Sequence, residues 1–171
     1  LSVGAKMLAD ALAKTVLPNT LQKYPGVEAG LSQVKFQPLD SGTLGLYRPR
    51  QGGSIAVDPS FSRFLKSTAW RDNFPDRTLK HEMGHALDYG AGSRFAKTPI
   101  LPYTEAEAPP GLMRQLIQSS KGSPYTYGDY PVHQAGLSEQ LATMFSRLDK
   151  VPEPWFDFIT MLNELAQQRT R

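Results

Sequence analysis

The sequence contains no cysteine, which excludes disulfide bridges and thiolate metal ligands from this chain. It also lacks an uninterrupted apolar run of about 18 residues, so it predicts no membrane-spanning helix. Lysine and arginine form no dense block, and a formal net charge of +3 is too small to argue for nucleic-acid binding. Any metal ion held by this chain would therefore be bound by histidine, aspartate or glutamate.

What the sequence does contain is typical of one globular domain covering residues 1–171. Hydrophobic residues make up 40% and charged residues 20% of the chain, enough apolar side chain for a sizeable core. The first residues include no initiator methionine, and Lys6 and Asp10 interrupt their apolar side chains, so they do not form a signal peptide. We interpret this start as a cut within a longer protein, whose preceding part would deliver or localise the domain.

The spacing of apolar residues predicts helices around a small sheet, which is the α+β class. An amphipathic helix is expected over the first residues, with its end at Pro18. Alternation predicts one strand at residues 34–36 and two more on either side of a turn at residues 48–53. A short helix is expected at residues 61–65, a Pro-rich surface crossing at 98–110, and later helices at 110–119, 135–148 and 154–168.

A further helix is predicted around the stretch "KHEMGHALDYGAG", residues 80–92. Asn73 can cap its start, Pro75 suits its first turn, and Gly90 and Gly92 indicate its end. On this helix His81 and His85 lie one turn apart and face the same way, so both imidazoles can reach one ion. The pattern is HExxH.

Two other residues of this helix, Glu82 and Gly84, also indicate a functional site. Glu82 lies about 100° round the helix from His81, beside the metal and free to take a proton from water. Gly84 inside the helix is unfavourable by up to about 1 kcal/mol relative to alanine. A close approach by another element or by substrate would explain that glycine.

Two histidines need a third ligand. The spacing HExxHxxGxxH would require histidine at position 91, where the chain has Ala91. The third ligand would then be a carboxylate distant in sequence, or His133. Glu139, in "GLSEQLATMFSRL", points away from the apolar stripe of its predicted helix and is one candidate. It could equally sit there because a carboxylate is favoured in the first turn of a helix.

Other side chains compete with Glu139 for this role. Asp129 and His133 are rivals for the third position. Glu105 and Glu107 lie in the Pro-rich stretch and are weaker candidates.

Several segments of the chain resemble the catalytic domain of the anthrax lethal factor family, zinc peptidases of the gluzincin type. "HEMGHALDYGAG" is similar to the active-site helix of that family, and "GLYRPRQGGSI" to the strand-turn-strand before it. "YTYG" followed by "EQLATMF" resembles its tyrosine loop and glutamate helix, and "PEPWFDFI" its closing helix. The resemblance covers about residues 44–168 in the same order and implies a zincin-like fold with an active-site helix.

The resemblance implies roles for particular residues. His81, His85 and Glu139 would bind one Zn²⁺, with Glu82 as general base. Tyr127 would support the oxyanion. The 12 positions between Tyr127 and Glu139 (139 − 127) exceed the spacing typical of the family, so Tyr130, Tyr125 or His133 are alternatives for the oxyanion.

Two further roles are expected around this site. Asp88 would accept the free N–H of a ligand histidine and fix its tautomer, or would simply face solvent. The strand formed by Ser54, Ile55, Ala56 and Val57 would offer its edge to an extended substrate, or would be an ordinary covered strand.

These features predict a zinc-dependent endopeptidase acting on a protein or peptide, with no nucleic-acid partner. The alternatives are a catalytically inactive zincin-like binding module and a zinc amidase acting on a cell-wall substrate. The resemblance also suggests a bacterial toxin or effector domain, secreted or delivered into a target cell. Such domains occur at the end of larger proteins such as type VI secretion spikes.

Overall fold

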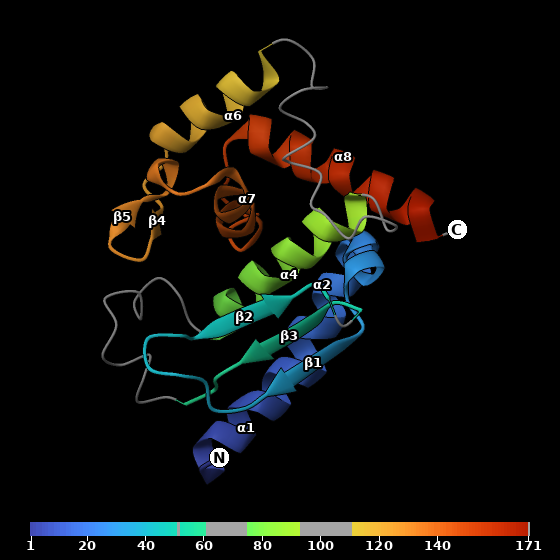
Figure 1. Ribbon diagram of the computed structural model, residues 1–171, viewed down its shortest axis with the longest axis vertical. Coiled ribbons are helices and arrows are strands. Elements are labelled where there is room, and N and C mark those ends of the chain that lie inside the picture. Colours follow the sequence, from blue (N-terminus) through green and yellow to red (C-terminus); the bar gives the residue numbers. More distant parts are fainter. Residues whose placement is uncertain (51, 61–74, 93–110, 171) are drawn as a thin grey trace.

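The computed structural model describes residues 1–50, 52–60, 75–92 and 111–170, and this part of the chain has a mixed α+β fold (Figure 1). The α-helices are α1 (Val3–Ala11), α2 (Leu17–Lys23), α4 (Pro75–Ala91), α6 (Leu112–Lys121), α7 (Leu137–Phe145) and α8 (Glu153–Thr170). The expected helix at 61–65, the crossing at 98–110, Asn73, Glu105 and Glu107 lie outside the described residues. No helix within the described ranges is long and apolar enough to cross a membrane.

The first helical region does not end at Pro18, contrary to the expectation from sequence. A π-helical segment, η1 (Leu12–Val16), joins α1 to α2, and Pro18 lies in the first turn of α2. A proline is tolerated there because the first N–H groups of a helix have no partner within that helix. The chain turns only after Lys23, into the 3₁₀ segment η2 (Pro25–Gly30).

Three short strands form the main sheet, in the order β1–β3–β2. They are β1 (Gln33–Phe36), β2 (Gly45–Arg48) and β3 (Ser54–Val57), close to the predicted positions. β3 pairs with β1 in parallel and with β2 antiparallel, over all four of its residues. The prediction that the edge of Ser54, Ile55, Ala56 and Val57 is open to substrate is therefore wrong, since β3 is the central strand of the sheet that the described residues form, and β2 lies at an edge of that sheet.

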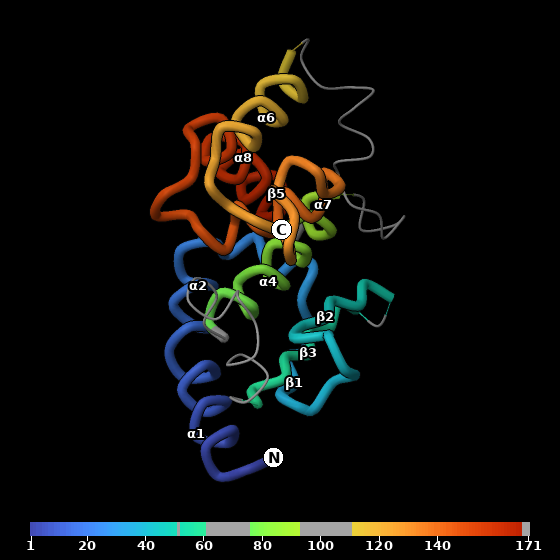
Figure 2. Tube along the Cα trace, turned by 90° about the vertical axis from the view of Figure 1, so that its left-hand side faces the viewer, coloured from blue at the N-terminus to red at the C-terminus, as the bar shows by residue number. Residues whose placement is uncertain are grey.

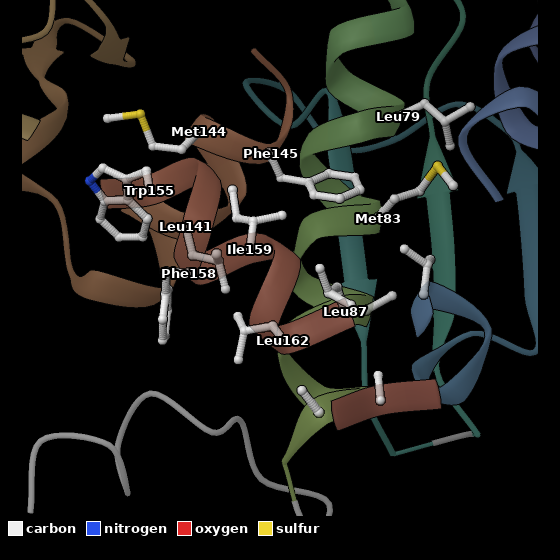
Figure 3. Packing of buried hydrophobic residues seen from close by; sticks show 14 of the residues in the cluster. Leu79, Met83, Leu87, Leu141, Met144, Phe145, Trp155, Phe158, Ile159 and Leu162 are labelled. Atoms are coloured by element: carbon white, nitrogen blue, oxygen red, sulfur yellow. The ribbon is translucent and has the colours of Figure 1, made fainter. Parts of the chain in front are cut away.

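Helix α4 is the centre of the fold, and it carries the HExxH motif. It contacts η2, α7, α8, β2 and β3. Figure 2 shows α1, α2 and α4 on the same side of the sheet. The stripe of Leu79, Met83 and Leu87 is fully buried in the hydrophobic core, to which α7 and α8 also contribute side chains (Figure 3). Burying one such side chain contributes about 1.5–3 kcal/mol, so this stripe fixes which face of α4 is left to the motif.

Gly84 permits α4 and α7 to pack closely. A Cβ atom on Gly84 would lie 2.9 Å from the Cα of Ala142 and 3.0 Å from the Cβ of Phe145. The approach by another element that the sequence suggested is thus made by α7. Because Glu139 is on α7, the separation of these two helices decides how far Glu139 lies from the two histidines.

Replacing Gly84 with alanine should lower the free energy of unfolding by about 1–3 kcal/mol, since the extra methyl group meets backbone and Cβ atoms that cannot rotate away. Urea unfolding of this variant would measure the loss. The matched control is Gly4→Ala in α1, where a Cβ meets no atom within 4 Å and alanine is the better helix former. Equal stability of the Gly84 variant and the wild type would contradict the close packing.

Candidate metal centre

His81, His85 and Glu139 form a group that could hold a metal ion, and one ligand atom from each lies within 4.8 Å of the others. The Nε2 atom of His81 is 2.9 Å from one carboxylate oxygen of Glu139, and the Nε2 of His85 is 3.0 Å from the other. The three side chains are 12–31% exposed, so the group is open to solvent on one side. The helices α4 and α7 thus bring together ligands that are 58 positions apart in sequence.

The donor set fits a small ion with a preference for nitrogen and oxygen. Donors bound to zinc lie about 2.0–2.2 Å from the ion, which puts them roughly 3–3.5 Å apart in a tetrahedral arrangement. The nitrogen-to-oxygen distances in this group are 2.9 and 3.0 Å. Only a small adjustment of the side chains would be needed to admit an ion, and three protein ligands leave a fourth position open.

Electrostatics favour the ionised form of Glu139 in this group. Burial alone would raise the pKa of Glu139, but hydrogen bonds with His81 and His85, and their charges, hold that pKa well below its ordinary value. The pKa of His85 is raised in turn: burial lowers it, but the hydrogen bond with Glu139 and the charges of Glu139, Glu82 and Asp88 together outweigh that effect. Glu139 is therefore in the ionised form that can bind a metal ion.

Glu82 lies beside this group as a buried carboxylate, 8% exposed. Burial raises the pKa of Glu82, the charge of Glu139 raises it further, and the charges of His81 and His85 partly offset both effects. A carboxylate with a raised pKa is a better proton acceptor at neutral pH than an ordinary surface glutamate. Glu82 is not one of the three converging ligands, in agreement with its expected role beside them.

Ser138 connects His85 to Asp88, and sequence reasoning missed it. The Oγ–H of Ser138 donates to Oδ2 of Asp88 at 3.1 Å, and the same oxygen lies 3.4 Å from Nδ1 of His85. With its own hydrogen directed to Asp88, the hydroxyl oxygen is left to accept from Nδ1–H of His85. When a metal ion replaces the proton between Nε2 and Glu139, this arrangement leaves the lone pair of Nε2 to the ion. Asp88 is fully buried, so its alternative role as a solvent-facing residue is excluded.

Replacing Ser138 with alanine should weaken metal binding by roughly 10-fold or more, because groups that orient ligand histidines typically contribute 10–100-fold to affinity. Competition with a coloured zinc chelator would measure the change. Ser138→Thr is the matched control, since it keeps the hydroxyl group and should bind with near wild-type affinity. Equal affinity of the alanine variant and the wild type would remove Ser138 from this network.

Tyrosines flank both histidines. The ring of Tyr127 stacks on His81 with centroids 6.1 Å apart, and the ring of Tyr47 stacks on His85 at 6.4 Å. Burial, followed by the charges of Glu139 and Glu82 and a hydrogen bond with Glu139, raises the pKa of Tyr127, which therefore keeps its proton at neutral pH. Tyr47 donates its hydroxyl hydrogen to the carbonyl oxygen of Gly30 at 2.6 Å.

The other candidates for the oxyanion role lie elsewhere. Tyr130 pairs with Tyr127 across the hairpin of β4 (Thr126–Tyr127) and β5 (Tyr130–Pro131), and it is 65% exposed. Tyr125 is buried, and its hydroxyl donates to the carbonyl oxygen of Lys150 at 2.6 Å. Of the predicted alternatives, Tyr127 alone lines the cleft that contains the histidines.

That cleft has a volume of about 740 Å³. Its walls are β2 with the preceding residues from Gly42, the exposed face of α4, the β4–β5 hairpin and the start of α7. The rivals for the third ligand position, Asp129 in the hairpin turn and His133 in the 3₁₀ segment η4 (Val132–Gln134), neither line the cleft nor belong to the ligand group.

Compared with protein-family models, with curated proteins and with solved structures, the chain matches none of them. The functional interpretation therefore depends on the site itself.

Proposed function

We propose that this chain is a zinc-dependent endopeptidase in which His81, His85 and Glu139 bind the metal and Glu82 is the general base. One observation carries the proposal: three metal-binding side chains and a buried carboxylate with a raised pKa meet in one open cleft. A site that only stabilises the fold is normally closed by four protein ligands and does not need an adjacent base.

Zinc, when bound, would polarise the scissile carbonyl group and acidify the attacking water. Glu82 accepts the proton of that water and passes it to the leaving amine. Tyr127, protonated at neutral pH and stacked on His81, donates a hydrogen bond to the oxyanion that develops on the carbonyl oxygen. Ser138 and Asp88 keep His85 oriented throughout.

The edge strand β2 supports an extended peptide as substrate. The amide of Asp58 donates to the carbonyl oxygen of Leu44 at 2.9 Å, which fixes the alternation of hydrogen bonds between β2 and β3. By that alternation Gly45 and Tyr47 direct their backbone N–H and C=O groups away from β3. These groups border the cleft, so a peptide can add to the sheet as a further strand beside the metal ligands.

The wider assignment follows from the resemblance in sequence. A zincin-like fold of the lethal factor type and an origin as a toxin or effector domain are both part of the proposal. The open cleft with Glu82 in its wall argues against an inactive binding module. A zinc amidase would use the same metal ligands and the same base. It differs from a peptidase only in the substrate that it cleaves.

A single experiment tests the proposal. The purified domain is stripped of metal with a chelator, reloaded with one equivalent of zinc, and incubated with a complex mixture of peptides and, separately, with peptidoglycan. We expect new peptide termini, found by mass spectrometry, only in the reloaded sample. Cleavage of peptidoglycan alone would make the chain an amidase, and tight zinc binding without any cleavage would support the binding module.

A further inference from the structure

Gly45 lies in β2 beside Glu82, and its backbone does not require glycine. It is not among the glycines with positive φ, so other residues could adopt its conformation. Glycine weakens a strand because it adds flexibility and offers no side chain to pack. The absence of a side chain at this position of a four-residue edge strand therefore needs another reason.

The reason is the distance to α4. A Cβ atom on Gly45 would lie 2.7 Å from Cγ2 of Thr78, 3.0 Å from Cγ of Glu82 and 3.0 Å from the Oε1 of Glu82. These distances are shorter than ordinary van der Waals contacts, and two of the three nearest atoms belong to the carboxylate side chain of Glu82. The room that a side chain would need at position 45 is occupied by Glu82 and Thr78.

We propose that Gly45 is a positioning residue for Glu82: its missing side chain leaves the space in which the carboxylate is held beside the metal ligands. The proposal rests on the function proposed above for Glu82. It adds that the strand which would pair with the substrate also sets the position of the base. A side chain at position 45 would move the Glu82 carboxylate, or push β2 away from α4, and either change alters the distance between base and substrate.

The primary experiment compares Gly45→Ala with the wild type and with the control Gly4→Ala, where a Cβ meets no atom within 4 Å. Zinc affinity, kcat and KM are measured on one peptide that the wild type cleaves. We expect Gly45→Ala to lower kcat by roughly 10- to 100-fold, since a displacement of about 1 Å can have an effect of that size. Zinc affinity should stay within about threefold of the wild type, because Glu82 is not a ligand. Unchanged kcat, or equal losses of kcat and zinc affinity, would overturn the proposal.

A second background separates Glu82 from Thr78. Thr78→Ser removes the Cγ2 methyl group, which is the atom nearest to the position that a Cβ on Gly45 would take. In that background Gly45→Ala is compared with Thr78→Ser alone. We expect the loss of kcat to persist, because the contacts with Glu82 remain. Full recovery of kcat would assign the effect to Thr78 and reject the positioning role.

A third measurement does not depend on activity. The loss of Tm caused by Gly45→Ala is determined in the wild type and in Glu82→Ala, which lacks both Glu82 atoms that the new Cβ would meet. If Gly45 leaves room for Glu82, the loss should shrink by about half or more in the second background, as expected for residues in contact. Equal losses would overturn the proposal even in an active enzyme. If the Tm loss shrinks in the Glu82→Ala background but the wild type cleaves no peptide, the contact between Gly45 and Glu82 is upheld and the proposed function is rejected.

Discussion

The Glu139→Ala variant should bind zinc more than about 100-fold more weakly than the wild type, since even groups that only support ligands contribute 10–100-fold. Among the described residues, its carboxylate is the member of the candidate ligand group that lies outside α4, and both of its oxygens face the imidazoles. Removing it leaves two histidines, which cannot enclose an ion. Metal analysis after dialysis, followed by competition with a chelator, would measure the change.

Two control variants make this prediction specific. Asp129→Ala and His133→Ala remove the rival ligands suggested by the sequence, and both should retain wild-type zinc affinity because neither side chain belongs to the ligand group. Circular dichroism would show that each variant is folded. Full zinc affinity in Glu139→Ala, with a loss in either control, would reassign the third ligand.

The Glu82→Gln variant should keep its zinc and lose nearly all turnover. Glutamine has the same shape, so packing against Gly45 and Thr78 is retained, but the amide cannot accept a proton from water. A positioned general base contributes about 10²–10⁴-fold, and kcat should fall by that factor. Initial rates on a cleaved peptide, measured at saturating zinc, test the prediction.

Zinc affinity is the internal control for this variant. Glu82 is not one of the three converging ligands. The zinc affinity of the Glu82→Gln variant should therefore differ from that of the wild type by less than about threefold, well below the effect of losing a ligand contact. Loss of zinc together with activity would mean that Glu82 is a ligand, and substantial remaining turnover would mean that another group is the base.

Much of the local structure can be predicted from the sequence, because it depends on local signals. The motif helix follows from the four-residue spacing of Leu79, Met83 and Leu87 and from the glycines near its end, and the structure describes α4 over Pro75–Ala91. The two strands around the turn at 48–53 follow from their alternation. Pro18 is misleading because an element break and a first helical turn both favour proline.

The arrangement of the strands cannot be predicted in this way. β3 pairs in parallel with β1, which precedes β2 in sequence, and nothing in a four-residue strand indicates which neighbour it will have on its second edge. The sequence therefore points to the wrong strand for the edge that borders the cleft. The sequence shows Gly45 only as a glycine at the start of a strand. The role that we propose for it depends on its distance to Glu82, which only the three-dimensional structure gives.

The candidate site is predictable in part. His81, His85 and Glu82 follow from one helix, whereas Glu139 stands out among several carboxylates only through the resemblance. In sequence Ser138 is only the residue before Glu139, since its contacts with His85 and Asp88 join α7 to α4 across 50 or more positions. Contacts of this kind depend on how two helices pack, and no periodicity within either helix encodes them.

The contact between His81 and Glu139 spans 58 positions, and the entropy of closing such a loop grows only with the logarithm of its length. Doubling the intervening segment would be unfavourable by only about 0.6 kcal/mol. The number of residues between His81 and Glu139 is therefore under little energetic constraint, provided that α7 still packs against Gly84. The packing surface of α7, more than the length of chain before it, decides whether the Glu139 carboxylate reaches the two histidines.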